Sequence, residues 1–446
     1  GITSGTAEFV ASGTLPNGAP VVLKSDGTVV TAAPTVSQLA AESIPAASAV
    51  VFNAGITTFT SIAFDPNNTN KFVIVYRDQN NSNYGEAIVG TISGTSISFG
   101  TEVVFSSVST AYTKIAFDPN TAGKFVIAYQ GNNIYGKAIV GTLSGTSVSF
   151  GTESQFASGT PYNTEIAFDP NTAGKFVVVY RQSSTSHHGE AIAGTVSGTS
   201  ISFGTAVVYI ASTVYANSIS FDPNTAGKFV VAYRDAGNSS HGTAIVGTLS
   251  GTSVSFGTPV VFNANTIYTL DLSFDPNTAG KFVVAYRNQG NAGYGTAIVG
   301  TMSGTSVSFG TAVVFNAGST SDMGISFDPN ATGKFVVSYA DLANSGYATA
   351  ILGVISGTSV SFGSENSVVS DVEGTTVSFD PNTAGKFVVA YKDYDNSNYG
   401  TAFLGQAEVI VSTQNLTSTN FLGTSTAAYT DTQTATIMLQ GGISTN

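Results

Sequence analysis

The segment Phe274–Tyr286 reads FDPNTAGKFVVAY and contains the pattern that decides the fold. Its first part is rich in turn residues: an Asp that can accept hydrogen bonds from the backbone, a Pro that fixes φ, and a Gly that permits positive φ. Its second part, Phe282–Tyr286, is apolar at every position. A strand with one face in water alternates between apolar and polar residues, so this run predicts a strand that is covered on both faces.

The motif Phe-Asp-Pro-Asn occurs seven times, with spacings of 53, 51, 53, 53, 53 and 52 residues. The motif phenylalanines are Phe64, Phe117, Phe168, Phe221, Phe274, Phe327 and Phe379. Each of the first six copies contains four strand-like runs separated by turn residues, which predicts a four-stranded antiparallel sheet. A small residue, Ala or Ser, precedes every motif Phe. Small residues suit a crowded axis, so the repeats favour a β-propeller over a linear solenoid.

The ends of the repeat array predict how it closes. The seventh repeat has no fourth run after Tyr399–Leu404, whereas Ala49–Gly55 precedes the first motif and matches Ala312–Gly318 nearly residue for residue. We therefore predict that the N-terminal strand completes the last sheet and closes a seven-bladed all-β propeller over residues 48–411, which also hides exposed sheet edges.

The two flanks lie outside this predicted ring. Residues 1–47 contain Asn-Gly and Asp-Gly pairs beside apolar runs, which are hairpin signals. A closed ring brings its two ends together, so we predict that residues 1–47 form an anchoring hairpin segment. Residues 412–446 are predicted to be a β segment that packs with it as one small β module.

The composition argues against several classes of function. The chain has no Cys and a net charge of −12. The missing Cys excludes disulfides, thiolate zinc sites and thiol nucleophiles. The acidic excess opposes binding to nucleic acid or to an anionic membrane. No signal-peptide pattern and no apolar segment of roughly 18 residues is visible. We expect no nucleic-acid or membrane partner and, because no phosphate-binding loop or metal triad stands out, no cofactor and no metal.

One face of the propeller is the better candidate for binding. The Asp-Pro-Asn and Ser-Gly-Thr-Ser turns of one face hardly differ between repeats, whereas the loops of the other face vary widely. Binding residues concentrate on loops, so we expect any binding surface on the variable face. There, Tyr or His precedes the third run of every repeat, at Tyr84, Tyr135, His188, His241, Tyr294, Tyr347 and Tyr399. These residues are either a stacking platform for sugar rings or aromatic groups that pack across strands.

A second set of residues precedes the first run of each repeat. Five repeats carry an aromatic residue there, namely Phe59, Tyr112, Tyr162, Tyr215 and Tyr268. The sixth and seventh repeats carry acids instead, namely Asp322, Asp371 and Glu373. This asymmetry indicates either a site for a glycan or a divalent cation, or a solvated acidic rim.

The other charged residues are expected to have structural roles. The four arginines Arg77, Arg181, Arg234 and Arg287 recur at one repeat position and are expected to pair locally with loop acids. Glu165 and Asp271 are candidates for a glycosidase carboxylate pair, but an ion pair of Glu165 with Lys114 is the simpler interpretation. The motif Asp residues are expected to cap turns. We therefore predict no catalytic residues and no enzymatic activity.

The repeats and flanks resemble those of a known class of proteins. The segment LPNGAPVVLKSDG at 15–27, with FLG at 421–423 and the later Gly-Gly pair, is similar to segments of repeat-propeller structural proteins of tailed, notably marine, bacteriophages. This resemblance implies a non-enzymatic capsid decoration or fibre on the virion surface, made in the host cytoplasm. The resemblance implies other virion proteins and host-surface glycans as partners. It also leaves open that the chain forms a homo-oligomer. The alternatives are a lectin-like carbohydrate-binding propeller and, more remotely, a glycosidase.

Overall fold

The computed structural model describes residues 6–11, 20–23, 28–31, 49–407, 421–425 and 434–439. The chain divides into two compact units, and each is described separately below. The first contains Gly1–Ser37 and Val409–Asn446, and the second contains Gln38–Glu408. None of the helices in the described residues is long and apolar enough to cross a membrane.

The first unit is one antiparallel sheet built from both ends of the chain. Its strands are β1 (Thr6–Val10), β2 (Pro20–Leu23), β3 (Val29–Thr31), β33 (Phe421–Ser425) and β34 (Thr434–Leu439). The strand order is β1-β34-β33-β2-β3. Strand β1 pairs with β34 over Thr6↔Met438 to Val10↔Thr434, so the two termini share one sheet.

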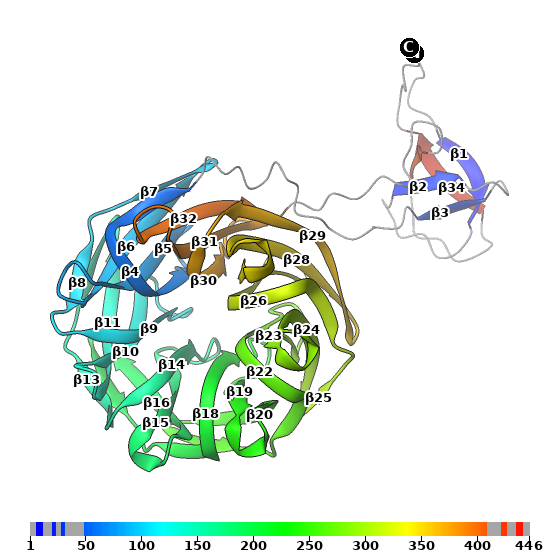
Figure 1. The fold of residues 1–446 in the computed structure, drawn as a ribbon. Helices are drawn as coiled ribbons and strands as arrows, with labels where there is room; N and C mark the ends of the chain where they lie inside the picture. Colours follow the sequence, from blue (N-terminus) through cyan, green and yellow to red (C-terminus); the bar gives the residue numbers. More distant parts are fainter. Residues whose placement is uncertain are drawn as a thin grey trace. The chain divides into compact units, whose positions relative to one another are not determined.

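The second unit contains the seven repeats, and every repeat begins with an inner strand. These strands are β4 (Val50–Phe64), β9 (Thr110–Phe117), β14 (Pro161–Phe168), β18 (Val207–Phe221), β22 (Val260–Phe274), β26 (Val313–Phe327) and β30 (Val372–Phe379). The second strands are β5 (Lys71–Asp78), β10 (Lys124–Gly131), β15 (Lys175–Gln182), β19 (Lys228–Asp235), β23 (Lys281–Asn288), β27 (Lys334–Asp341) and β31 (Lys386–Asp393). The sheets follow one another around a central axis, with the first strands nearest to it (Figure 1).

The third and fourth strands complete each sheet toward the outside. The third strands are β6 (Tyr84–Ser93), β11 (Tyr135–Ser144), β16 (His188–Ser197), β20 (His241–Ser250), β24 (Tyr294–Ser303), β28 (Tyr347–Ser356) and β32 (Tyr399–Gln406). The outer strands are β7 (Ser96–Phe99), β8 (Val103–Ser106), β12 (Ser147–Phe150), β13 (Ser154–Ser158), β17 (Ser200–Phe203), β21 (Ser253–Phe256), β25 (Ser306–Phe309) and β29 (Ser359–Val369). Short 3-10 helices follow four second strands, namely η3 (Ser183–Thr185), η4 (Ala236–Asn238), η5 (Gln289–Asn291) and η6 (Leu342–Asn344). All these sheets are antiparallel, as the repeat pattern predicts.

Several strands belong to two sheets at once. In β22, Val260–Thr266 pairs with β20 of the preceding repeat, and Ile267–Phe274 pairs with β23 of its own repeat. Strands β18 and β26 do the same. Strand β4 repeats this arrangement across the ends of the array, because Val50 pairs with Ala402 of β32 while its later residues pair with β5. The structure thus contains the predicted pairing of the N-terminal strand with the last repeat.

The apolar second strands are covered on both faces, as their sequence predicts. Phe282, Val284 and Tyr286 of β23 pack into one cluster with residues of β19, on the preceding repeat. Val283 and Ala285 pack into another cluster with residues of β27, on the following repeat. All five side chains are buried. Each sheet is therefore packed between its two neighbours, and the core consists of the layers between them.

Glycine on the third strand makes room for the phenylalanine of the second strand. A Cβ on Gly300 would lie 2.1 Å from Cζ of Phe282, so the ring packs directly on the glycine backbone. Equivalent contacts occur in the other repeats, for example between Gly90 and Phe72. An aromatic ring that covers a strand glycine helps to fix the register between the two strands.

The Asp-Pro-Asn turns join neighbouring repeats along one face. Asp275 Oδ1 accepts a hydrogen bond from Asn277 N at 3.0 Å, which is the predicted turn capping. Asn277 Nδ2 in turn donates to Pro329 O of the next repeat at 3.2 Å. The other Asn residues of the motif make the same bond, with carbonyl acceptors at Pro119, Pro170, Pro223, Pro276, Pro381 and, for Asn382, Asp65.

Candidate ligand-binding site

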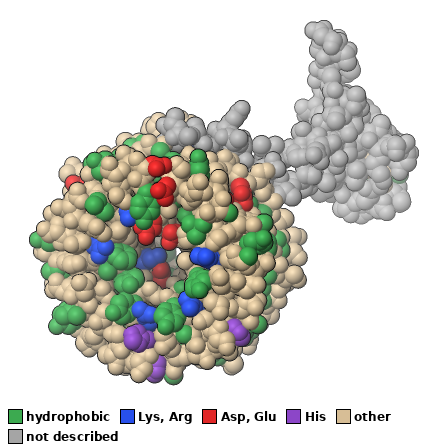
Figure 2. All heavy atoms as spheres, viewed as in Figure 1, with side chains coloured by type: hydrophobic (Ala, Val, Ile, Leu, Met, Phe, Trp, Pro, Cys, Tyr) green, Lys and Arg blue, Asp and Glu red, His purple; other side chains and the backbone are tan. Residues whose placement is uncertain are grey.

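A cavity of about 600 Å³ lies where the first strands of all seven repeats converge. Its lining comes from the residues just before the motif Phe of each repeat and from the ends of two second strands, at Arg77 and Lys392. They include Phe59, Arg77, Tyr112, Lys114, Asn163, Glu165, Tyr215, Tyr268, Asp271, Asp322, Glu373 and Lys392. Figure 2 shows this face, with a hollow at the centre, Lys and Arg side chains around it, and acidic side chains gathered in one sector. The sequence therefore brings aromatic, cationic and acidic groups of distant segments to one place.

A β-bulge in the first strand points several of these side chains toward the cavity. The register shifts between Thr58 and Ser61 in β4, and comparable shifts occur in the other first strands. At the bulge, Phe59 has φ 54°, Tyr112 has φ 51° and Asp322 has φ 50°. Positive φ is unfavourable for bulky residues other than glycine, and bulges re-aim side chains next to binding sites. The strained backbone is thus located at the cavity wall.

The aromatic residues form a continuous row with arginines between them. The Phe59 and Tyr112 rings are 5.0 Å apart, and the Tyr112 and Tyr162 rings are 5.8 Å apart, between centroids. Arg181 Cζ lies 4.4 Å from the Tyr162 ring centroid and 5.4 Å from that of Tyr215. These contacts run across the first three repeats and into the fourth.

The row continues through the fourth and fifth repeats. Arg234 Cζ lies 4.7 Å from the Tyr215 centroid and 4.9 Å from the Tyr268 centroid, so it is held between two rings. Arg287 Cζ lies 5.2 Å from the Tyr268 centroid and ends the row on this side. A cation over an aromatic face is attracted by the ring quadrupole, and the contact fixes the plane of the guanidinium.

The expected ion pairs of the four arginines are not found. Within the described residues, the ion pairs are Lys114–Glu165, Lys137–Glu153 and Lys392–Glu373, and none involves an arginine. The carboxylates of the loop acids accept hydrogen bonds from the backbone. Asp78 Oδ1 accepts one from Asn80 N at 2.8 Å, and Asp235 Oδ1 accepts one from Gly237 N at 3.0 Å. The arginines stack on Phe59 and on the tyrosines instead, a contact that we did not predict.

A signal for this stacking was present in the repeats. The residue after the buried Tyr of the second strand is Arg in repeats one, three, four and five, and each of these repeats carries an aromatic residue before its motif. The sixth repeat has Ala340 there and Asp322 in place of the aromatic residue. The second repeat keeps Tyr112 but has Gln130 in place of Arg, so the two positions change together only in part.

The acidic sector of the cavity comes from the sixth and seventh repeats. Asp322 and Glu373 line the cavity, whereas Asp371 does not. Burial raises the pKa of Asp322, and the hydrogen bond from Gly374 N offsets part of this effect. Burial also opposes ionisation of Glu373, but the Tyr394 hydroxyl and the Lys392 ammonium outweigh it and lower the pKa of Glu373. Lys392 Nζ lies 3.0 Å from Glu373 Oε2.

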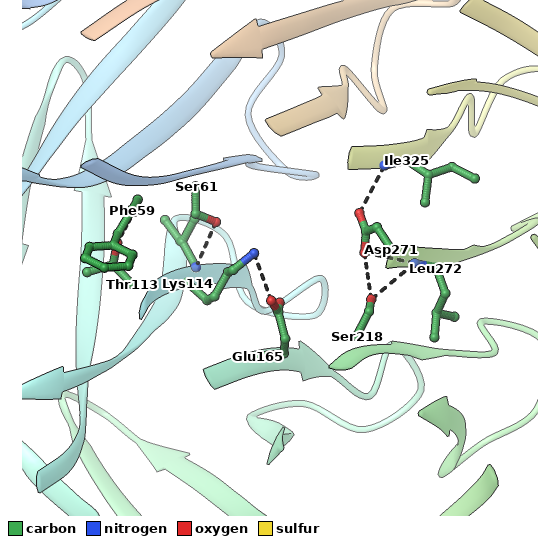
Figure 3. Close-up of polar contacts among 10 residues, drawn as sticks. Phe59, Ser61, Thr113, Lys114, Glu165, Ser218, Asp271, Leu272 and Ile325 are labelled. Atoms are coloured by element: carbon green, nitrogen blue, oxygen red, sulfur yellow. Dashed lines mark hydrogen bonds and ion pairs between the residues drawn. The ribbon is translucent and has the colours of Figure 1, made fainter. Parts of the chain in front are cut away.

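Three charged residues lie deeper, next to the axis. Lys114 Nζ is 2.9 Å from Glu165 Oε1, so the predicted ion pair is present (Figure 3). Asp271 lies on the other side in this view and accepts hydrogen bonds from Ser218 Oγ at 2.6 Å, Leu272 N at 2.9 Å and Ile325 N at 3.0 Å. Both carboxylates are therefore held by neighbouring donors.

The protonation of these axial groups is shifted by their surroundings. Burial raises the pKa of Glu165 to about 7, although the Lys114 ammonium acts in the opposite direction. Burial also raises the pKa of Asp271. For Lys114, burial favours the neutral form, but the charges of Glu165 and Asp271 outweigh it and raise the pKa of this amine. No group of three or more His, Cys, Asp or Glu side chains that could hold a metal ion occurs in the described residues.

The other predicted ring of aromatic residues lies elsewhere on the repeats. Tyr84, Tyr135, His188, His241, Tyr294, Tyr347 and Tyr399 each begin a third strand, and none of them lines the cavity. Tyr135 is 38% exposed. The structure therefore does not combine the two predicted sets into one site. His187, beside His188, stacks on Tyr162 with 6.5 Å between ring centroids.

Comparisons with known proteins concern the fold. No protein-family model matches the sequence, and no curated protein is similar to it. The crystal structure of the BP39L lectin from Burkholderia pseudomallei is similar with a TM-score of 0.61 and 8% identity, over 79% of this chain and 97% of the lectin chain. A chain of the mitotic checkpoint complex has a TM-score of 0.54 and 8% identity, over 84% and 96% of the two chains. Sqt1 from Saccharomyces cerevisiae has a TM-score of 0.50 and 10% identity, over 81% and 99%. The fold is that of a repeat β-propeller. At these identities, the similarity shows the architecture alone.

Proposed function

We propose that this propeller binds carbohydrate in the cavity at its axis. The observation that carries the proposal is the pair of tyrosines at the cavity wall, Tyr215 and Tyr268, which are 47% and 40% exposed although arginines stack against their rings. The exposed edges of aromatic rings that are held in place, with polar groups beside them, suit the apolar faces and hydroxyl groups of sugars. The lectin among the similar structures supports this choice over a purely structural role.

The architecture that we propose for this site is a closed ring of seven blades. Two features support closure. Val50 and Val51 of β4 pair with Ala402 and Thr401 of β32, as in the other shared strands. In addition, Lys386 Nζ of the seventh repeat donates to Gly94 O of the first repeat at 2.8 Å. A ring of this kind places all seven first strands around one cavity.

We further propose that the site recognises its ligand without catalysis. A glycosidase needs one carboxyl group as proton donor and a second as nucleophile or base. Here Glu165 is paired with Lys114, and Asp271 accepts three hydrogen bonds, two of them from the backbone. These contacts are those of structural carboxylates. Loss of a measured glycan-hydrolysing activity in Glu165→Gln and Asp271→Asn variants would contradict this proposal.

The proposal is tested by a glycan array with the full chain, followed by calorimetric titration of the strongest hit. We expect Tyr215→Ala to weaken the binding about tenfold, because it removes one stacking surface. Tyr135→Ala is the matched control, since Tyr135 is similarly exposed but lies outside the cavity. A chain that binds no glycan on the array, or a Tyr135→Ala effect as large as that of Tyr215→Ala, would contradict the proposal.

A location on a phage particle is a second proposal, carried by the resemblance of the repeats and flanks to phage propellers. The sheet made from both chain ends supports it, because a separate unit is available for anchoring. Mass spectrometry of purified virions tests it directly. A protein that fractionates away from intact particles would remove the virion proposal and leave carbohydrate binding in place.

A further inference from the structure

The arginines of the third, fourth and fifth repeats carry charges that the protein does not neutralise. No acidic group of the described residues forms an ion pair with Arg181, Arg234 or Arg287. The buried Nε of each has no hydrogen-bond partner in the same part of the chain. Polar groups withdrawn from water without a partner cost free energy, and this cost is repeated three times at one position of the repeat.

Arg77 of the first repeat occupies the same position, and its side-chain donors do have hydrogen-bond acceptors. Its guanidinium also stacks on an aromatic ring, with Cζ 4.7 Å from the Phe59 centroid. However, its Nε donates to Thr58 Oγ1 at 2.9 Å and its Nη1 to Thr110 O at 3.5 Å. The missing acceptors are therefore a property of the other three repeats rather than of the fold.

The three arginines are also fixed in place and spaced regularly. Tyr215 separates Arg181 from Arg234, and Tyr268 separates Arg234 from Arg287. Rings on the guanidinium faces leave the edges as donors, and a planar edge matches the two oxygens of a carboxylate or sulfate. The result is a row of cationic and aromatic groups that alternate along three repeats.

From this row we infer that the ligand is an acidic glycan, whose carboxylate or sulfate groups pair with Arg181, Arg234 and Arg287 while its sugar rings contact the exposed edges of Tyr215 and Tyr268. This inference rests on the proposed carbohydrate binding and adds the ligand's charge. Asp322 and Glu373 line the cavity, whereas Arg181, Arg234 and Arg287 contact Tyr215 and Tyr268 without being part of the lining. Repulsion by the two acids favours binding of the anionic groups on the arginine side. A nucleic acid is the other polyanion that the row could bind, and it is one outcome of the test below.

The test compares matched charged and neutral sugars on the full chain by calorimetric titration. The probes are hexasaccharides of mannuronate and of sulfated galactan, the corresponding uncharged mannose and galactose hexasaccharides, and a single-stranded oligothymidylate. We expect at least one acidic hexasaccharide to bind about tenfold more tightly than its neutral counterpart, with an affinity that falls as salt is raised. The two acidic probes distinguish carboxylate from sulfate recognition.

Substitutions test which residues recognise the charge of the sugar. Arg234→Gln is expected to remove the preference for the acidic sugar over its neutral counterpart. Lys228→Gln is the control, because it removes the same charge from the opposite end of β19, where Lys228 Nζ bonds Thr248 Oγ1 at 2.7 Å. Arg181→Gln repeats the test at an independent position, and unchanged thermal unfolding shows that the variants fold.

Three outcomes would contradict the inference, and they can be distinguished from one another. Equal affinity for acidic and neutral sugars would overturn the inference but preserve carbohydrate binding. Tighter binding of the oligothymidylate than of either acidic sugar would overturn the inference in favour of nucleic acid. Failure of all four hexasaccharides to bind, together with an array without hits, would remove the inference and the proposed function together.

Discussion

Asn382 donates a hydrogen bond from Nδ2 to the backbone carbonyl of Asp65, 317 residues earlier in the sequence, at 3.5 Å. In the other repeats, the corresponding Asn bonds the carbonyl of the next motif Pro at 3.1 to 3.2 Å. The junction between the last and first repeats therefore repeats the contacts within the array, with a slightly longer bond. Strand β4 also joins these two repeats, because it pairs with β32 of the last repeat.

The side chain that anchors this junction is Phe52. It is 5% exposed, lies 5.2 Å from Tyr76 and 5.9 Å from Phe99 between centroids, and covers Gly400 of the last repeat. We expect Phe52→Ala to lower the free energy of unfolding by about 3–5 kcal/mol, because a buried ring is lost from the core. Urea unfolding followed by tyrosine fluorescence measures this, since the chain has no Trp.

The control for this variant is the adjacent Val51, which is 38% exposed. Val51→Ala should cost less than about 1 kcal/mol. If the two substitutions had similar effects, the N-terminal strand would not be part of the core of the last sheet.

At the binding site, Tyr268 is expected to act through its ring rather than its hydroxyl group. The first repeat contributes Phe59 to the row, from one position nearer its motif Phe, so the row does not depend on a phenol. We expect Tyr268→Phe to change the dissociation constant less than about twofold and Tyr268→Ala to raise it about tenfold. Calorimetric titration of the best array glycan measures both, and a large loss in Tyr268→Phe would assign the binding to the hydroxyl group.

The axial Glu165 should give the protein an unusual dependence of stability on pH. Its pKa is raised to about 7 from a usual value of 4.5 by burial. Between these values the native protein holds a proton that the unfolded chain releases, so the free energy of unfolding decreases as the pH rises through this window. Because the side chain is still 21% exposed, we expect a change of about 1–3 kcal/mol. Urea unfolding at several pH values should show this slope in the wild type and its loss in Glu165→Gln.

Glu153 provides a comparison of opposite sign. Burial opposes its ionisation, but Lys137 and the Tyr129 hydroxyl outweigh burial and lower its pKa. Its contribution to stability is therefore present above the usual carboxyl pKa and is lost as the pH falls toward the native value. Glu153→Gln should accordingly alter the acid side of the stability profile and leave the slope near neutral pH unchanged. If Glu165→Gln altered only the acid side as well, Glu165 would have an ordinary pKa.

Much of the fold could be predicted because its determinants are local or repeated. The all-apolar run Phe282–Tyr286 predicted cover on both faces, and the displaced copy at Ala49–Gly55 predicted the pairing of β4 with β32. Each of these inferences needs only the alternation of strands and the comparison of one repeat with another.

The site was harder to predict because it depends on backbone detail and on competition between partners. Tyr112 enters the cavity wall at a bulge with positive φ, which a sequence pattern for a regular strand does not reveal. Arg234 was expected to pair with a loop acid, but the carboxylate of the adjacent Asp235 already accepts a backbone hydrogen bond. Only the three-dimensional arrangement shows that Tyr215 and Tyr268 are the partners that remain.

The strands shared by two sheets also determine how the molecule comes apart. Strand β22 cannot leave its own sheet without drawing on the sheet of the preceding repeat, and β4 extends this linkage to the seventh repeat. Shared strands of this kind join the third to sixth repeats, through β18, β22 and β26, and the seventh repeat to the first, through β4. Repeats that share a strand are therefore expected to unfold together rather than one by one. Proteolysis that requires one of these strands to be released would then require two sheets to open.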